Sequence, residues 1–359
     1  MKFIHISDIH FGSKNNIENS LIINNFKAIQ NYALKNKINH ILISGDIVEK
    51  EMVDISVREL FNNKSINYYI IPGNHDCPLE PILSPLKNVR LFLDSPFSKE
   101  NINEQLRIYG VPYTKEYSAS EIFNSIADDM NINNVKKVII IVHGSPIGKH
   151  FGIIDLDREK VKHFPIFYED IANLISTDIS IYLGIGHYHS NFQTGIFNNL
   201  LWCIPGSIYP LSIKEAESRM ISIYDTNTHS LSSLAIKDIT NLTKSEYLIN
   251  SFSIAGLKNE ILEKSNKLNA FTKHYISING YTDDIKQLDT LIREIDIKWN
   301  KNHELPIIWI KDIKYTKSIA PELQIIINHI ISKGEQSNLS TNIINESIQL
   351  AIKGYLLSK

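Results

Sequence analysis

The sequence has few cysteines, no large excess of charge of either sign and no long apolar run. Its 359 residues include only two cysteines, Cys77 and Cys203, which form neither a metal-binding CxxC pair nor a disulfide framework. No apolar stretch approaches the roughly 18 residues that a membrane span needs, and the first residues lack the pattern of a secretory signal peptide. We therefore expect a cytoplasmic protein that makes no contact with a membrane.

The balance of charge limits the classes of partner. A formal net charge of −2, with 21% charged residues, is ordinary for a globular protein and argues against a protein coated by a polyanion. It still allows a local positive site that binds nucleic acid. Hydrophobic residues make up 43% of the chain, which is enough for one large domain with smaller ones beside it.

Short apolar runs alternate with helix-like segments over residues 1–190. The apolar stripes of Ser20–Lys35 and Tyr168–Ile175 predict helices, and Ser118 with Glu121 forms a capping box that predicts another. Strands alternating with helices are typical of a layered α/β domain. The runs with the length and the Ile and Val content of buried strands are Lys2–Ser7, Ile38–Ser44, Ile66–Pro72, Lys137–Val142 and Ile179–Leu183.

After residue 200 the pattern changes to strands separated by turns. Leu200–Ile204, Met220–Tyr224 and Leu231–Ile236 predict a second sheet packed on the first, so we expect residues 1–239 to form a four-layer αββα sandwich. Residues 240–315 predict a linker with a helix and then a strand–helix–strand unit, which would be a small α+β cap domain. Residues 316–359 predict a helical tail of two amphipathic helices, divided at Gly334. The tail would dock either on the chain's own domain or on a partner helix, and we favour the partner.

Polar residues that can bind metals follow the five predicted strands. Residues two apart on an extended chain point to the same side, so Asp8 and His10 can reach one ion together. We expect all these side chains to meet at one edge of a sheet and to form a metal centre there. The motifs are Asp8-Ile9-His10, Gly45-Asp46, Gly73-Asn74-His75-Asp76, His143-Gly144 and Gly186-His187-Tyr188-His189.

The chemistry of these residues predicts two divalent ions. Two aspartates, one asparagine and four histidines offer oxygen and nitrogen ligands, which suit Mn, Fe or Zn. They are too many for one tetrahedral ion, whereas two ions that share a carboxylate would use them all. The ions would bring more charge than Asp8 and Asp46 return, so the centre would attract a phosphate ester. His75, next to Asn74, is the natural general acid for the leaving oxygen.

The order of the motifs resembles that of the calcineurin-like metallophosphoesterase superfamily. The resemblance covers residues 1–190, and the continuation Asp-Arg-Gly of Ser/Thr protein phosphatases is absent. It implies that Asp46 bridges the two ions. The first ion would be held by Asp8, His10, Asp46 and His189. The second ion would be held by Asp46, Asn74, His143 and His187.

A second resemblance narrows the substrate class. Residues 202–212, WCIPGSIYPLS, followed by Glu215, are similar to a segment of SbcD-type DNA repair nucleases, which also carry a small cap domain. This resemblance implies a Mn-dependent DNA exo/endonuclease, with DNA as substrate, that works with an SbcC-type coiled-coil ATPase and leaves open a homodimer. Glu49 stands where these nucleases commonly have Asp or His, and we expect it to orient His75.

Other interpretations stay open. A small-molecule phosphodiesterase or phosphatase would use the same centre, and the near-neutral charge favours it. A metal-binding scaffold that recruits an ATPase should have lost a ligand, and none is missing. Asp76 either supports the ligands or caps its turn, and Ser207 is expected to stabilise its loop. The histidines that match no motif receive structural roles, with a substrate contact as the alternative for His150; they are His5, His40, His150, His163, His229, His274, His303 and His329.

Overall fold

The chain forms two compact units in the computed structural model, Met1–Leu242 and Thr243–Lys359. The predicted boundary residues 239 and 316 lie outside the described residues. No helix in the described part of the chain is long and apolar enough to cross a membrane. The structure describes all residues except 13–15, 50–54, 134, 153–162, 176–177, 190–191, 213–214, 216–218, 236–241, 250–253, 269, 271, 283–284, 304, 316–320, 338, 340–342, 345, 349, 352–353 and 355–359.

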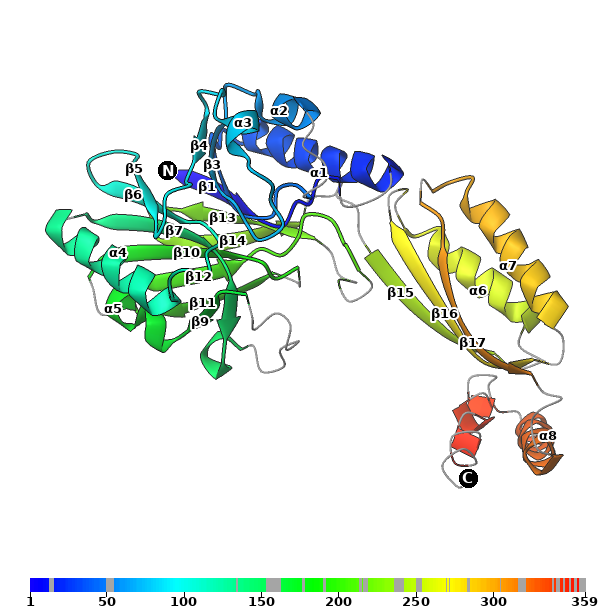
Figure 1. The fold of residues 1–359 in the computed structure, drawn as a ribbon. Helices are drawn as coiled ribbons and strands as arrows, with labels where there is room; N and C mark the ends of the chain where they lie inside the picture. The colour runs from blue at the N-terminus through cyan, green and yellow to red at the C-terminus, as the bar shows by residue number, and fades with distance from the viewer. Residues whose placement is uncertain are drawn as a thin grey trace. The chain divides into compact units, whose positions relative to one another are not determined.

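The first sheet of the larger unit has six strands in the order β14-β13-β1-β2-β3-β4. Strands β1 to β4 are parallel neighbours, whereas β13 pairs antiparallel with β1 and β14 with β13. Helices α1, α2 and α3 flank this sheet (Figure 1). The bounds are β1 Lys2–Ile6, α1 Asn16–Lys35, β2 His40–Ser44, α2 Ile55–Phe61, β3 Asn67–Ile71, α3 Glu80–Leu83, β4 Val89–Leu91, β13 Met220–Asp225 and β14 Ser230–Ala235.

The second sheet also has six strands, in the order β11-β12-β10-β7-β6-β5. Its four inner strands are parallel and its two edge strands antiparallel. Strands β8 (Ser145–Ile147) and β9 (Pro165–Phe167) form a separate parallel pair. The other bounds are β5 Ser98–Asn101, β6 Leu106–Val111, α4 Ala119–Asn133, β7 Lys137–His143, η1 Lys149–Phe151, η3 Glu169–Ile171, α5 Ala172–Ile175, β10 Ser180–Gly186, β11 Gln193–Phe197 and β12 Leu200–Ile204.

The alternation of side chains on the strands makes the layers. In β7, Ile139 and Ile141 belong to a buried cluster with residues of the first sheet such as Leu42. Ile140 lies between them in sequence and belongs instead to the cluster that contains Phe123 of α4. Successive side chains of a strand point to opposite faces, so one strand contacts both the other sheet and a helix. The predicted four-layer αββα arrangement is confirmed.

The composition of the two sheets differs from the prediction in one respect. Residues 200–238 do not form a sheet of their own, because β12 pairs with β10 in the second sheet and β13 pairs with β1 in the first. The apolar pattern of these segments predicted strands, and the structure confirms them as β12, β13 and β14. An alternating pattern identifies a strand but carries no information on which edge it joins.

The smaller unit contains a three-stranded sheet, β15-β16-β17, and helices α6 and α7. Its core is a cluster that includes Ile276, Leu288 and Trp299. Helix α8 ends at Gln336, and residues 343–344 and 346–348 are helical again, so the tail has the two predicted helical stretches, with the first ending two residues beyond Gly334. A Cβ at Gly334 would lie 2.5 Å from the side chain of Ile344, so the glycine also permits close packing. The bounds are β15 Leu242–Ile249, α6 Ile254–Ser265, β16 Lys273–Thr282, α7 Ile285–Trp299, β17 Ile308–Tyr315 and α8 Pro321–Gln336.

Candidate metal centre

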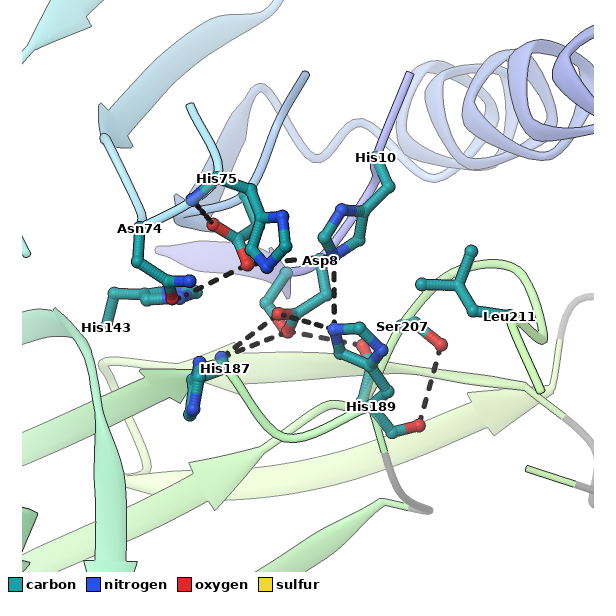
Figure 2. A network of polar contacts seen from close by, with 12 residues as sticks. Asp8, His10, Asn74, His75, His143, His187, His189, Ser207 and Leu211 are labelled. Atoms are coloured by element: carbon teal, nitrogen blue, oxygen red, sulfur yellow. Dashed lines mark hydrogen bonds and ion pairs between the residues drawn. The ribbon is translucent and has the colours of Figure 1, made fainter. Parts of the chain in front are cut away.

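The parallel strands of both sheets end at the predicted metal ligands. Figure 2 shows six of their side chains converging, those of Asp8, His10, Asn74, His143, His187 and His189. Strands β1, β2 and β3 of the first sheet precede Asp8, Asp46 and Asn74. Strand β7 of the second sheet ends at His143, and β10 leads to His187. The expectation of a single sheet edge is therefore wrong, because two sheets contribute ligands. Carboxyl ends of parallel strands gather loops at one end of each sheet, and here the two ends lie side by side, as the hydrogen bond between His143 and Ser44 O shows.

Several of the predicted ligands have a left-handed backbone. The φ angles are 51° at Asp8, 54° at His10, 53° at Asp46 and 95° at His187. Residues other than glycine occupy this region at a cost of about 1–3 kcal/mol each, and they do so mainly at functional sites. Hydrogen bonds between the loops hold them there: Asp8 N–H donates to Gly45 O at 3.1 Å and His10 N–H to Asp46 O at 3.0 Å.

The first cluster consists of Asp8, His10, Asp46 and His189, whose ligand atoms lie within 4.8 Å of one another. Nε2 of His10 is 3.1 Å from Nε2 of His189 and 3.6 Å from Oδ2 of Asp46. Burial opposes the ionisation of Asp8, but the hydrogen bond and the charge of His189 outweigh it and lower the Asp8 pKa to about 2. His189 Nε2 in turn lies 3.5 Å from Oδ1 of Asp8, so two ring nitrogens and two carboxylates converge on a site that suits a cation.

The second cluster consists of Asp46, His143 and His187. The Nδ1 of His143 donates to Ser44 O at 2.8 Å, so Nε2 faces the cluster, 3.3 Å from Asp46 Oδ2 and 3.0 Å from Asn74 Oδ1. The hydrogen bond from Nδ1 to Ser44 O fixes the His143 ring in the orientation that a metal ligand needs. Burial and the charge of His143 lower the pKa of His187 to about 3, so His187 is neutral, as a ligand must be.

Two buried atoms of these clusters accept or donate no hydrogen bond among the described residues. They are Oδ2 of Asp46 and Nε2 of His187. Leaving a carboxylate oxygen and a ring nitrogen buried without partners costs free energy, and a divalent ion at each cluster would remove that cost. The oxygen and nitrogen donors suit Mn, Fe or Zn. The described residues thus fit two ions, with Asp46 common to both clusters.

Glu49 lies between His10 and His75. Its Oε1 is 2.7 Å from Nδ1 of His10 and its Oε2 is 3.3 Å from Nδ1 of His75. The hydrogen bond from His10 is the main cause of the lowered pKa of Glu49. The side chain of His75 is 45% exposed, while its backbone N–H donates to Asp46 Oδ1 at 2.9 Å. The structure therefore anchors His75 at the metal centre, leaves its ring open to a substrate, and places Glu49 closer to His10 than to His75.

Asp76 joins the loops that follow β2 and β3. Its Oδ1 accepts the backbone N–H groups of Ile47 and Val48, both at 2.8 Å, and its Oδ2 accepts that of Gly73 at 2.7 Å. Burial raises the pKa of Asp76 to about 6. Gly73 is required here, because a Cβ would lie 2.2 Å from Asp46 Oδ1. Asp76 thus both closes its own turn and fixes the loop that carries Asp46.

Glu215 and Arg219 contact His189 and hold its loop in place. No role was predicted for either residue from the sequence. Oε2 of Glu215 accepts the hydroxyl of Ser207 at 2.8 Å and the N–H of Leu211 at 2.9 Å, and Oε1 lies 3.8 Å from Nδ1 of His189. Arg219 donates to the carbonyl oxygen of His189 at 2.8 Å. Ser207 stabilises this loop as expected, since its hydroxyl also donates to Tyr209 O. The Ser-x-x-Pro-Leu-Ser segment was the only sequence signal for this network.

Some histidines outside the motifs also have defined places. His163 lies beside the second cluster, its ring 5.4 Å from that of His187 and its Nδ1 3.1 Å from the hydroxyl of Tyr113. His5 is buried between Ser44 and Tyr182, which agrees with a structural role. His150 stacks on a tyrosine, Tyr168, at 4.4 Å. The sequence therefore missed His163 as a neighbour of the centre.

The family model of the calcineurin-like phosphoesterases matches residues 1–200, and the chain belongs to this family. These residues contain every predicted ligand, so the protein is a hydrolase of phosphoester bonds with a dimetal-type residue cluster. Among solved structures, it is similar to a dimetal phosphatase from Danio rerio, with 9% identity and a TM-score of 0.41 over 62% of this chain and 91% of that one. It is also similar to a protein of unknown function from Aquifex aeolicus, with 14% identity and a TM-score of 0.26 over 46% and 88%. No curated protein matches the chain.

We expect the affinity for Mn²⁺ to rise with pH up to about pH 9. Burial opposes the protonation of His143, but the charge of Asp46 outweighs it and raises the pKa of His143 to about 9. Below that pH the metal-free protein holds a proton at this histidine, and an ion must displace it. Calorimetric titrations in two buffers of different ionisation enthalpy should detect released protons at neutral pH. His143→Gln should reduce the release and the exposed control His329→Gln should not; uptake of Mn²⁺ without protons would contradict the assignment.

We also expect Glu215→Gln to weaken metal binding at the first cluster. Residues that orient a metal ligand typically contribute roughly 10–100-fold to metal affinity, and Glu215 lies within 3.8 Å of His189. Equilibrium dialysis with Mn²⁺ would measure the loss. Glu246→Gln is the matched control, because Glu246 is 58% exposed and belongs to the smaller unit. Equal affinities of the two variants would show that Glu215 has no part in holding His189.

Proposed function

We propose that this protein is a Mn-dependent DNA exo/endonuclease that acts in DNA repair or processing. The observation that carries the proposal is the buried network of Ser207, Glu215 and Arg219 beneath His189. Ser207 and Glu215 of this network belong to the segment that resembles SbcD-type nucleases, and Arg219 contacts a predicted metal ligand, His189, directly. The α+β unit that follows the phosphoesterase unit supports the same proposal, since those nucleases carry a small cap.

The residues of the chain divide the work of phosphodiester hydrolysis. When bound, two divalent ions would polarise the phosphate and acidify a water molecule. Asp8 and Asp46 remain ionised, because neighbouring histidines outweigh burial and lower the pKa of each, and so they balance the charge of the ions. His75 can donate a proton from Nε2 to the leaving oxygen when its Nδ1–H donates to Glu49. The exposed ring of His75 is on the side that a substrate can reach.

We further propose an SbcC-type coiled-coil ATPase as partner, and we leave open a homodimer. The net charge of −2 supplies little neutralisation of a DNA backbone, so a second subunit that adds positive charge would strengthen DNA binding. Helix α8 carries exposed apolar side chains, with Ile325 68% and Ile326 44% exposed. Such a helix face is the kind that packs on a partner helix, which supports this proposal.

A small-molecule phosphodiesterase or phosphatase is the second candidate. The same net charge favours it, because a small phosphoester requires only the local charge of the metal centre, whereas DNA presents a long row of phosphates. An assay of DNA cleavage separates the two functions.

Purified protein with Mn²⁺ should cut linear duplex or single-stranded DNA, and faster with its ATPase partner. The same preparation with a chelator, and an Asp46→Asn variant, should be inactive. Gel analysis of end-labelled DNA would show whether ends or internal bonds are cut. Hydrolysis of nucleotide or aryl phosphates alone, with no cleavage of DNA under any metal or partner condition, would favour the second candidate and reject the nuclease.

His75→Ala should lower kcat by about 10²-fold or more, because a positioned general acid typically contributes that much. The metal content of the variant should stay at the wild-type level, since the backbone N–H of His75 rather than its ring contacts Asp46. Metal analysis and steady-state kinetics on the same samples would check both statements. His329→Ala, which removes an exposed histidine of α8, serves as control. Loss of metal from His75→Ala would make His75 a ligand.

A further inference from the structure

A cavity of about 310 Å³ is formed by the loop after β6 and the segment around β9. Aromatic side chains supply much of its wall. Tyr117 and Phe167 stand at the surface, 39% and 43% exposed, while Phe164 is buried. Its volume is at the lower end of the range for small-molecule sites. Its lining includes Tyr113, Lys115, Tyr117, Phe164, Phe167 and Asp170.

One lining residue of this cavity, Tyr113, also lies beside the second metal cluster. Tyr113 N–H donates to Pro72 O at 3.1 Å, directly before the loop that carries Asn74. The ring of Tyr113 lies 6.4 Å from that of His143. On the other side, Ser145 N–H donates to Phe164 O at 2.9 Å. Tyr113 and Phe164 thus line the cavity and are also tied to the segments that carry Asn74 and His143.

The cavity suits a flat ring better than a second phosphate. Its charged side chains are one cation, Lys115, and one carboxylate, Asp170, which is engaged by the N–H of Phe167 at 2.7 Å. Two hydroxyls on its wall are engaged within the protein, that of Ser118 with Glu121 at 2.8 Å and that of Tyr113 with His163 at 3.1 Å. What remains for a ligand is mainly aromatic surface. A phosphate would require several convergent donors, and the described lining provides a single lysine.

We propose that this cavity is the subsite for one unpaired nucleobase next to the phosphate that is cleaved. The inference rests on the proposed function and adds to it where the substrate's base is held. Base stacking on aromatic side chains tolerates any sequence, because every base has a π face. A base held between Tyr117 and Phe167 must have left its duplex, so we expect the enzyme to prefer unpaired ends over internal duplex.

Binding of a mononucleotide tests the subsite without turnover. The full-length protein loaded with Mn²⁺ should bind deoxyadenosine 5′-monophosphate about tenfold more tightly than deoxyribose 5-phosphate, as expected for the stacking of one base. In a Tyr117→Ala/Phe167→Ala variant the two ligands should bind alike, with the sugar phosphate unaffected. Tyr32→Ala, which removes a half-buried tyrosine of α1, should keep the preference. Equal binding of both ligands by the wild-type protein would overturn the subsite.

Cleavage of oligonucleotides separates this inference from the proposed function. The double variant should raise KM about tenfold for a single-stranded oligonucleotide, and should leave KM and kcat unchanged for the same strand with abasic sites beside the cleaved bond. If both proteins cut the normal strand with equal KM, the nuclease stands and the subsite fails. If the nucleotide preference is found but no DNA is ever cut, the subsite stands and the nuclease fails.

Discussion

The buried carboxylate of Asp46 is the constraint on which the functional end of this protein depends. Its Oδ1 accepts the N–H of His75, and its Oδ2 lies 3.3 Å from His143 and 3.6 Å from His10 without a hydrogen bond from any described residue. The nearby histidines lower its pKa despite burial, the charge of His143 most of all. A buried anion is tolerated only beside cations. The surrounding loops must therefore bring protonated histidines or metal ions to this one side chain.

Much of the fold follows from local pattern. The length and branching of Ile38–Ser44 or Lys137–Val142 determine a strand, and the alternation within β7 determines which side chains meet the other sheet and which meet α4. The pairing of β13 with β1 does not follow, because nearly 220 residues separate the partners and no short pattern specifies an edge. The strand β15 was missed for a related reason: its sequence, LTKSEYLI, is largely polar, and its pairing within the three-stranded sheet is set by the fold.

The site likewise contains residues that can be identified from their type and place in the sequence, and others whose contacts depend on the tertiary structure. Asp8, His10 and His143 could be named from the sequence because few residue types bind metals and these stand at strand ends. Arg219 could not be named, since its contact is with the carbonyl oxygen of His189, and any residue offers a carbonyl. Tyr113 and His163 are brought beside the second cluster from separate loops, a proximity that only the tertiary structure creates. Glu49 was expected to serve His75, and its closer contact with His10 links residues 39 positions apart, which no local pattern predicts.

The origin of the ligands in two different sheets has a mechanical consequence. The first cluster joins Asp8 and His10, which follow the first sheet, to His189, which follows β10 of the second. The second cluster joins Asp46 of the first sheet to His143 and His187 of the second, so each ion would connect the two sheets. Apolar contacts such as Leu42 against Ile141 resist separation of the layers but oppose sliding only weakly, whereas coordination fixes direction as well as distance. Ligand binding to the native state alone adds its free energy to stability. The two ions, when bound, would thus fix the position of one sheet relative to the other, and the metal-loaded protein would be more stable than the metal-free protein.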